Sequence, residues 1–147
     1  MYRKILIKLC YVAPVFVIII ALFYPFGYTS RVVVNGKVFS VEVVDTQALL
    51  QKGLSGHTSL SDSQGMFFVF GKPGNYGFWM KDMTFPLDII WTDANFKIVH
   101  IEKSLSPSTY PKIFYPNAES EYVLEVSAGQ ADMARANIGD TVTFLKK

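Results

Sequence analysis

No charged side chain occurs between Lys8 and Arg31, and most of the residues between these two are apolar. An apolar run of about 20 residues is long enough to cross the hydrocarbon core of a membrane as a helix. The sequence therefore predicts a membrane anchor or signal segment at residues 1–30. The remaining residues, 31–147, suffice for one domain, because a single core usually serves about 100 to 200 residues.

Three basic residues, Arg3, Lys4 and Lys8, precede the apolar run. By the positive-inside rule they keep the N-terminus in the cytoplasm, so the domain is expected across the membrane. We expect a single-pass protein of the cell inner membrane, with its domain on the periplasmic or extracellular side. A cleaved signal peptide has the same layout and would give a secreted domain. The bulky aromatic residues of "FYPFGYTS", which stand where small residues are needed for cleavage, favour a retained anchor.

The charges of the exported part exclude one class of partner. All 12 acidic residues follow residue 30, together with 11 of the 14 basic ones, so residues 31–147 have a formal charge of −1. No cluster of Lys or Arg occurs there, and binding to a phosphate backbone depends on such a cluster. We expect no nucleic-acid partner. The single cysteine, Cys10, lies in the apolar run, so the domain has no disulfide.

Short runs of β-branched and aromatic residues separated by turn signals dominate the domain. "RVVVNGKVFSVEVV" predicts a hairpin, because Asn35-Gly36 tolerates the positive φ angles of a type I′ turn. "GMFFVF" is apolar at consecutive positions, which is typical of a central strand covered on both faces. Further strands are expected at 78–83, 87–92, in "KIVHIEKSL", in "EYVLEVSAG" and at the C-terminus.

Two short helices are expected, in "DTQALLQKG" and in "QADMARAN". With so little helix and so many short strands, the fold class is all-β. The predicted architecture is an antiparallel sandwich or a partly open barrel, preceded by one N-terminal transmembrane helix.

The motifs "GLSGHTSL", "GMFFVF", "FWMKDMTFPLDIIW", "YVLEVSAG" and "IGDTV", in this order, resemble the DUF192 family. The resemblance covers roughly residues 38–144 and implies a compact β-rich fold at residues 31–147, but it implies no reaction. Two positions depart from the family pattern, which commonly has Arg in place of His57 and Asn in place of Asp82. A site that depended on that Arg would here have a shorter group that titrates near neutrality.

The segment "FWMKDMTFPLDIIW" concentrates aromatic, Met and charged residues. If it is extended, Trp79, Lys81 and Met83 share one face, and Lys81 needs a partner among apolar neighbours. Asp88 needs one too, because a buried charge without compensation is costly. We expect Lys81 and Asp88, on adjacent strands, to pair with each other or with Glu125 or His57.

Such a polar network has two interpretations. It can fix the register of the strands, or it can stand at the mouth of a pocket walled by Trp79, Phe85 and Trp91. The second interpretation predicts a module that binds a small polar or saccharide-like ligand. Its predicted ligand-binding residues are His57, Trp79, Met80, Lys81, Asp88 and Glu125.

Two other function classes stay open. A hydrolase would use Asp88 and Glu125 as a general acid/base pair with His57 as a proton shuttle. Glu125, however, alternates with Glu121 and Ser127, which favours a solvated side chain, and we assign no catalytic residue. An envelope protein-protein interaction domain would use the aromatic loop from Tyr110 to Tyr115, which can also simply cover a barrel end.

No metal and no cofactor are predicted. The two histidines, His57 and His100, lie in different elements, without carboxylates at ligand spacing. The glycine-rich turns lack the strand-to-helix context of a phosphate-binding loop.

Overall fold

The computed structural model describes residues 30–147. The predicted membrane segment at residues 1–30 therefore lies outside the described residues, apart from Ser30, which begins the first strand. Within the described part of the chain, no helix has both the length and the apolar character needed to span a membrane.

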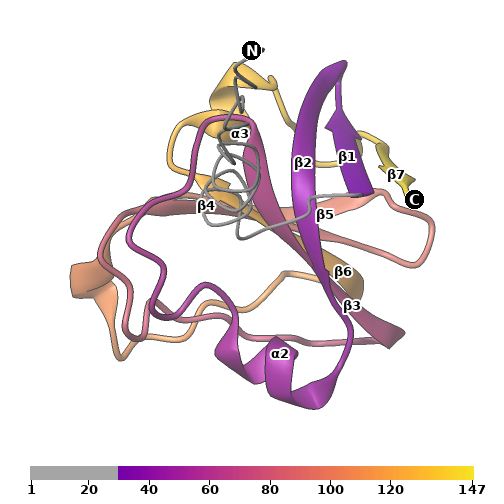
Figure 1. The fold of residues 1–147 in the computed structure, drawn as a ribbon. Helices are drawn as coiled ribbons and strands as arrows, with labels where there is room; N and C mark the ends of the chain where they lie inside the picture. The colour runs from indigo at the N-terminus through magenta and orange to yellow at the C-terminus, as the bar shows by residue number, and fades with distance from the viewer. Residues whose placement is uncertain (1–29) are drawn as a thin grey trace, which may run out of the picture.

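One sheet of seven strands forms the body of residues 30–147, in the order β5-β4-β6-β3-β2-β1-β7 (Figure 1). Two short helices lie at opposite ends of it in this view: α2 (Gln47–Lys52) and α3 (Gln130–Met133). A 3-10 turn, η1, spans Pro107–Thr109. The strands are β1 (Ser30–Val34), β2 (Lys37–Val44), β3 (Gln64–Gly74), β4 (Leu87–Thr92), β5 (Ile98–Leu105), β6 (Ser120–Ser127) and β7 (Val142–Leu145). The all-β class with two short helices is confirmed.

The sequence predicted an antiparallel sheet, but the sheet is mixed. Strands β2 and β3 pair in parallel, with Val43 opposite Phe67, while every other pair in the sheet is antiparallel. Parallel neighbours need a long crossover connection, and here the connection contains α2. Its helical signal was visible in the sequence, but the direction in which the chain returns was not.

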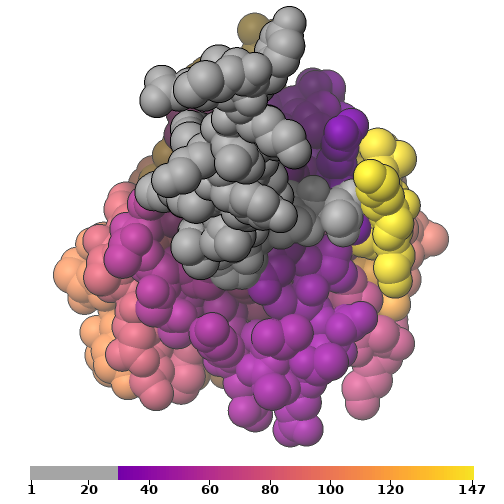
Figure 2. Space-filling model, viewed as in Figure 1, coloured from indigo at the N-terminus to yellow at the C-terminus, as the bar shows by residue number. Residues whose placement is uncertain are grey.

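The two edges of the sheet approach each other, so the sheet curls into a half-barrel. Lys97 and Thr141 form an isolated antiparallel bridge between the segments that precede β5 and β7. The backbone N–H of Ile98 donates to the carbonyl of Asp140 at 2.8 Å. Figure 2 shows the yellow residues of β7 beside the indigo residues of β1, the strand with which β7 pairs. The partly open barrel is confirmed, and the sandwich alternative is wrong, since residues 30–147 form one sheet.

Two predicted local features are confirmed. Strands β1 and β2 form the hairpin, and Asn35 and Gly36 have φ angles of 47° and 84°, as a type I′ turn requires. Strand β3 is the fourth of the seven strands, and its residues Met66, Phe67 and Phe68 are all buried.

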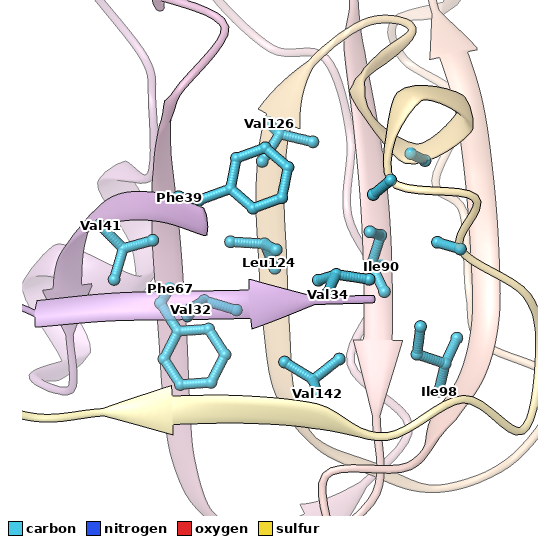
Figure 3. Close-up of a cluster of buried hydrophobic side chains, with 13 residues drawn as sticks. Val32, Val34, Phe39, Val41, Phe67, Ile90, Ile98, Leu124, Val126 and Val142 are labelled. Atoms are coloured by element: carbon cyan, nitrogen blue, oxygen red, sulfur yellow. The ribbon is translucent and has the colours of Figure 1, made fainter. Parts of the chain in front are cut away.

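Each face of the sheet has its own hydrophobic core, because side chains alternate along a strand. The inner core fills the curl of the half-barrel and receives side chains from all seven strands, among them Phe67, Ile90 and Leu124 (Figure 3). The outer core lies on the convex face of β3, β4 and β6 and includes Phe68 and Trp91. Helix α2 and the long connections cover it, and these connections position the candidate site.

The strand expected at 78–83 does not form. Phe78 makes a single bridge with Phe114, and the chain then turns at Lys81 and Asp82. Asp82 has a φ of 55°, a left-handed conformation that Asp and Asn tolerate better than most residues. The segment lies over the sheet instead of within it, so no strand neighbour continues its ladder.

Candidate functional site

A cavity of about 380 Å³ lies over the outer face of the sheet. Its walls come from three connections: the end of α2 with residues 53–55, the segment 75–83, and the segment 113–115. The sheet contributes side chains of β3 and β6. A cavity of this size accommodates a small molecule.

Aromatic rings contribute a third of the described residues that line the cavity. Six of them line the cavity: Phe68, Phe70, Tyr76, Phe78, Trp79 and Tyr115. Phe70 and Tyr76 stack with ring centroids 3.6 Å apart, and Phe68 meets Phe78 edge to face at 4.9 Å. Tyr76 is also fixed by its hydroxyl, which donates to the carbonyl of Lys72 at 2.9 Å. Rings held by one another in this way present a preformed apolar wall.

The mouth of the cavity is partly aromatic and partly basic. Trp79 is 46% exposed and meets Tyr110 edge to face at 5.9 Å. The ammonium group of Lys81 lies 5.8 Å from the centre of the Trp79 ring, a cation–π contact. Lys52, at the end of α2, also lines the cavity.

Gly77 allows the outer wall to pack closely. Two hydrogen bonds of 2.9 and 2.8 Å join the backbones of Phe78 and Phe114, and they bring the two segments together. A Cβ atom at Gly77 would lie 2.5 Å from the Tyr115 ring and 2.6 Å from the side chain of Ile113. The absence of a side chain at this position therefore sets the shape of the outer wall.

Among the described residues that line the cavity, Glu125 is the one acidic residue. It lies on β6 between Met66 of β3 and Ile89 of β4, and it is 5% exposed. Among residues 30–147 no group hydrogen-bonds to its Oε2 atom. Burial raises the pKa of this carboxyl from 4.5 to about 8, so it is mostly protonated at neutral pH.

The expectation that Glu125 is solvated was wrong. Alternation correctly placed it on the face opposite Leu124 and Val126, but that face is covered by the outer core. Alternation predicts the face on which a side chain lies, but it does not predict which distant segments cover that face.

Asp88 does not pair with Lys81, which corrects the expected network. Asp88 is fully buried, and its two oxygens accept backbone N–H groups of Ser104 at 2.7 Å and Ala131 at 2.8 Å. Its side chain lies on the inner face, because its neighbour Ile89 shares the outer face with Glu125. Asp88 is not among the residues that line the cavity.

The other predicted ligand-binding residues lie in the wall of the cavity, next to that wall, or in the outer core. Trp79 and Lys81 line the cavity, whereas Met80 is 1% exposed and packs in the outer core beneath them. His57 lies just beyond the lining residues Leu54 and Ser55, and its Nδ1 is 3.0 Å from the carbonyl of Leu54. The structure thus places three of the six predicted residues, Trp79, Lys81 and Glu125, around one cavity.

Trp91 is a core residue and not a pocket wall. It is fully buried, and its indole N–H donates to the carbonyl of Tyr76 at 2.9 Å. This bond holds the segment 75–83 against β4. Phe85 packs at the border of the outer core and does not line the cavity.

Several lining residues were missed in the sequence, above all Phe70, Tyr76 and Lys52. The Gly and Pro residues of "GKPGNYG" predict a turn, and only its Tyr is of a type that commonly lines a pocket. Lys52 is an ordinary basic residue in the last turn of a helix, so no local signal sets it apart.

The cavity combines apolar and polar groups. It offers flat aromatic surfaces, one buried carboxyl and two lysines at its mouth. Within residues 30–147, no cluster of three or more His, Cys, Asp or Glu side chains could hold a metal ion.

Two solved structures have the same fold. A protein of unknown function from Novosphingobium aromaticivorans DSM 12444 is 30% identical, with a TM-score of 0.71 over 78% of this chain and 82% of that one. A proposed transcription regulator from Sinorhizobium meliloti 1021 is 24% identical, with a TM-score of 0.71 over 78% of this chain and 91% of that one. The second likeness shows the fold alone.

No match was found among curated protein sequences. A family match is clear, however. The DUF192 family, described as "Uncharacterized ACR, COG1430", matches residues 30–144, which include every strand of the sheet except the last residue of β7. The chain belongs to the DUF192 family.

Proposed function

We propose that this domain binds a small polar or saccharide-like ligand in the cavity over the outer face of the sheet. The ring faces of Trp79, Tyr76 and Phe70 suit the flat, weakly apolar face of a sugar or similar ring. Polar groups stand at both ends of the cavity, with Glu125 at the sheet and two lysines at the mouth.

The observation that carries this proposal is the carboxyl of Glu125. A buried polar atom normally has a hydrogen-bond partner, because leaving it without one costs about 1 to 3 kcal/mol. Oε2 has none among the described residues, yet the residue borders a cavity large enough for a ligand. A bound molecule would supply the missing partner.

The predicted anchor at residues 1–30 also predicts where in the cell the domain would bind its ligand. With residues 1–30 in the inner membrane, the cavity would face the periplasm or the extracellular side, where sugars of the envelope are available. Fractionation of cells that produce the full chain, with protease added from outside, tests this location. The protease is expected to degrade the domain once it can reach the periplasmic or extracellular side of the inner membrane. Recovery of the domain in the cytosolic fraction would contradict this location.

Thermal unfolding in the presence of envelope compounds tests binding itself. A ligand at 100 times its Kd stabilises the folded state by about 2.7 kcal/mol, which is readily measured. Trp79→Ala should remove the shift, whereas Met133→Ala should keep it. Met133 is a suitable control, because it is an exposed apolar residue, 71% exposed, that lies in α3 and not at the cavity.

An envelope protein partner is the second candidate function, and an exposed apolar patch supports it. Trp79, Tyr110, Ile113 and Tyr115 are 42–51% exposed and lie together at the mouth of the cavity. Aromatic residues of this kind are enriched at protein interfaces. If no compound of a broad panel shifts the unfolding temperature, while pull-downs with the full chain recover one defined membrane protein and Tyr115→Ala loses it, this second function is correct.

A further inference from the structure

The charged groups on the outer face of the sheet form a pattern that the cavity alone does not reveal. Residues directly opposite each other on paired strands share a face. The registers therefore define one row across five strands: Glu42 of β2, Met66 of β3, Glu125 of β6, Ile89 of β4 and Glu102 of β5. Three of its five members are acidic.

Glu125 is the middle member of this row and the only acidic one that is nearly fully buried. Neighbouring strands lie about 4.8 Å apart, so Glu42 and Glu102 are each about 10 Å away, on either side of it. Both are half-buried. Neither of them lines the cavity, and burial is the cause of the raised pKa of Glu125. Glu125 is therefore the acidic group of the row that a ligand in the cavity would meet.

Among residues 30–147, no Lys or Arg lies within 4.0 Å of the Glu125 carboxyl group. His100, on the same face of β5, is 3.2 Å from Glu102, and Lys81 lies over the Trp79 ring. The other titratable groups around the cavity are Lys52, Tyr76 and Tyr115, which come from α2 and from the two covering segments.

From this arrangement we infer that the ligand carries a protonated amine, which enters the cavity and pairs with the carboxylate of Glu125. The inference rests on the proposed binding function and narrows it to small amine-bearing compounds, such as amino sugars and amino acids. The aromatic walls fit the same class, because ring faces attract a desolvated cation. The lysines at the mouth fit the outer end of the ligand when that end is anionic or rich in hydroxyl groups.

A neutral ligand that accepts a hydrogen bond from the protonated carboxyl is the competing chemistry, and the two predict opposite pH dependences. An amine binds the ionised carboxylate, so binding below pH 8 releases a proton from Glu125. Its affinity should rise by up to about tenfold per pH unit between pH 6 and pH 8. A neutral acceptor needs the proton to stay, so its affinity should fall above pH 8.

The experiment uses the full chain and matched pairs of compounds that differ in one group. The pairs are glucosamine and glucose, phenylalanine and phenyllactate, and phenethylamine and phenethyl alcohol, each tested by calorimetry at millimolar concentration. The pH series uses the phenylalanine and phenethylamine pairs, because those amines stay protonated throughout. Glu125→Gln removes the charge and keeps the size, and Glu119→Gln makes the same change at an exposed residue away from the cavity.

The inference requires three results together: an amine that binds at least tenfold more tightly than its hydroxyl partner, affinity that rises with pH, and loss of binding in Glu125→Gln but not in Glu119→Gln. If hydroxyl members bind equally well, or if affinity falls with pH, the amine class is wrong and the binding function stands. If no member of any pair binds, both the amine class and the proposed binding of a saccharide-like ligand fail.

Discussion

Asp88 and Glu125 lie on adjacent strands, one position apart in register, with their side chains on opposite faces of the sheet. Glu125 is directly opposite Ile89, and Asp88 is directly opposite Val126. The two carboxyl groups are therefore separated by the sheet itself. This geometry excludes a general acid/base pair made of these two residues.

The two acids also differ in how their polar atoms are satisfied. Asp88 accepts two backbone N–H groups and so ties the end of β5 and the start of α3 to β4. Glu125 has neither bond and borders the cavity. The first is a structural group, and the second is the group on which the proposed ligand binding rests.

Asp88→Asn should destabilise the fold by about 2 to 4 kcal/mol. The amide keeps one acceptor, but its NH₂ group would face a backbone N–H donor in a fully buried site. Urea unfolding measures the loss, and Asp62→Asn is the control, because Asp62 is exposed in the connection before β3. A variant as stable as the parent would show that the two backbone bonds contribute little.

Glu125 should make the domain less stable as the pH rises. Because its pKa is raised on folding, the folded state binds more protons than the unfolded state between pH 4.5 and about 8. Its contribution to stability is thus fully retained below pH 4.5 and is lost progressively up to pH 8. The loss reaches roughly 5 kcal/mol, at about 1.4 kcal/mol per pH unit.

Glu125→Gln isolates this effect, because Gln does not titrate. The free energy of unfolding of the variant, minus that of the parent, should increase from pH 4.5 to pH 8 and then level off. Denaturant unfolding at a series of pH values provides the measurement. A difference that stays constant with pH would mean that the carboxyl is ionised in the folded protein.

Trp79 and Met80 are neighbours in sequence, but truncation should affect them differently. Met80→Ala removes a side chain from the outer core and should cost about 2 to 5 kcal/mol. Trp79 is nearly half exposed, so Trp79→Ala should cost less than about 1 kcal/mol. Urea unfolding of both variants checks this order. The reverse order would place Trp79 in the core and remove it from the cavity wall.

Gly77→Ala should displace the outer wall of the cavity. The new Cβ would approach Tyr115 and Ile113 within 2.6 Å, and crowding of this kind typically costs about 1 to 3 kcal/mol. Shortening one of the two obstructing side chains, in Gly77→Ala/Ile113→Ala, should recover part of the stability, and a double-mutant cycle with the two single variants measures the coupling. A coupling near zero would show that the two segments do not pack as described.

Local signals predicted the elements well where a short stretch determines its own conformation. Asn35 and Gly36 adopt positive φ angles with little strain, so the hairpin could be predicted from two residues. The apolar run at Met66 to Phe68 indicated a central strand, and the structure covers it on both faces. The prediction failed at residues 78–83, because a strand needs a partner, and the availability of a partner is not a local property.

The candidate site was predicted in part for the same reason. Trp79 and Lys81 stood out by composition, and both line the cavity. Asp88 stood out too, but its backbone partners, Ser104 and Ala131, come from segments 16 and 43 residues away. The sequence favoured a solvated side chain for Glu125 and also named it as a ligand-binding residue. Alternation alone could not predict whether the face that carries it was covered.

The amino-acid sequence alone was enough to predict the family, the β-rich class, the hairpin and the buried central strand. Each of these depends on residue types within a short window, or on a motif order that the chain shares with its relatives. Three features are seen only in the folded chain: β2 and β3 run parallel, the sheet curls into a half-barrel, and connections from distant parts of the chain cover the face bearing Glu125. Local residue types could not predict the site, because burial depends on what covers a residue, and here the covering segments lie far away along the chain.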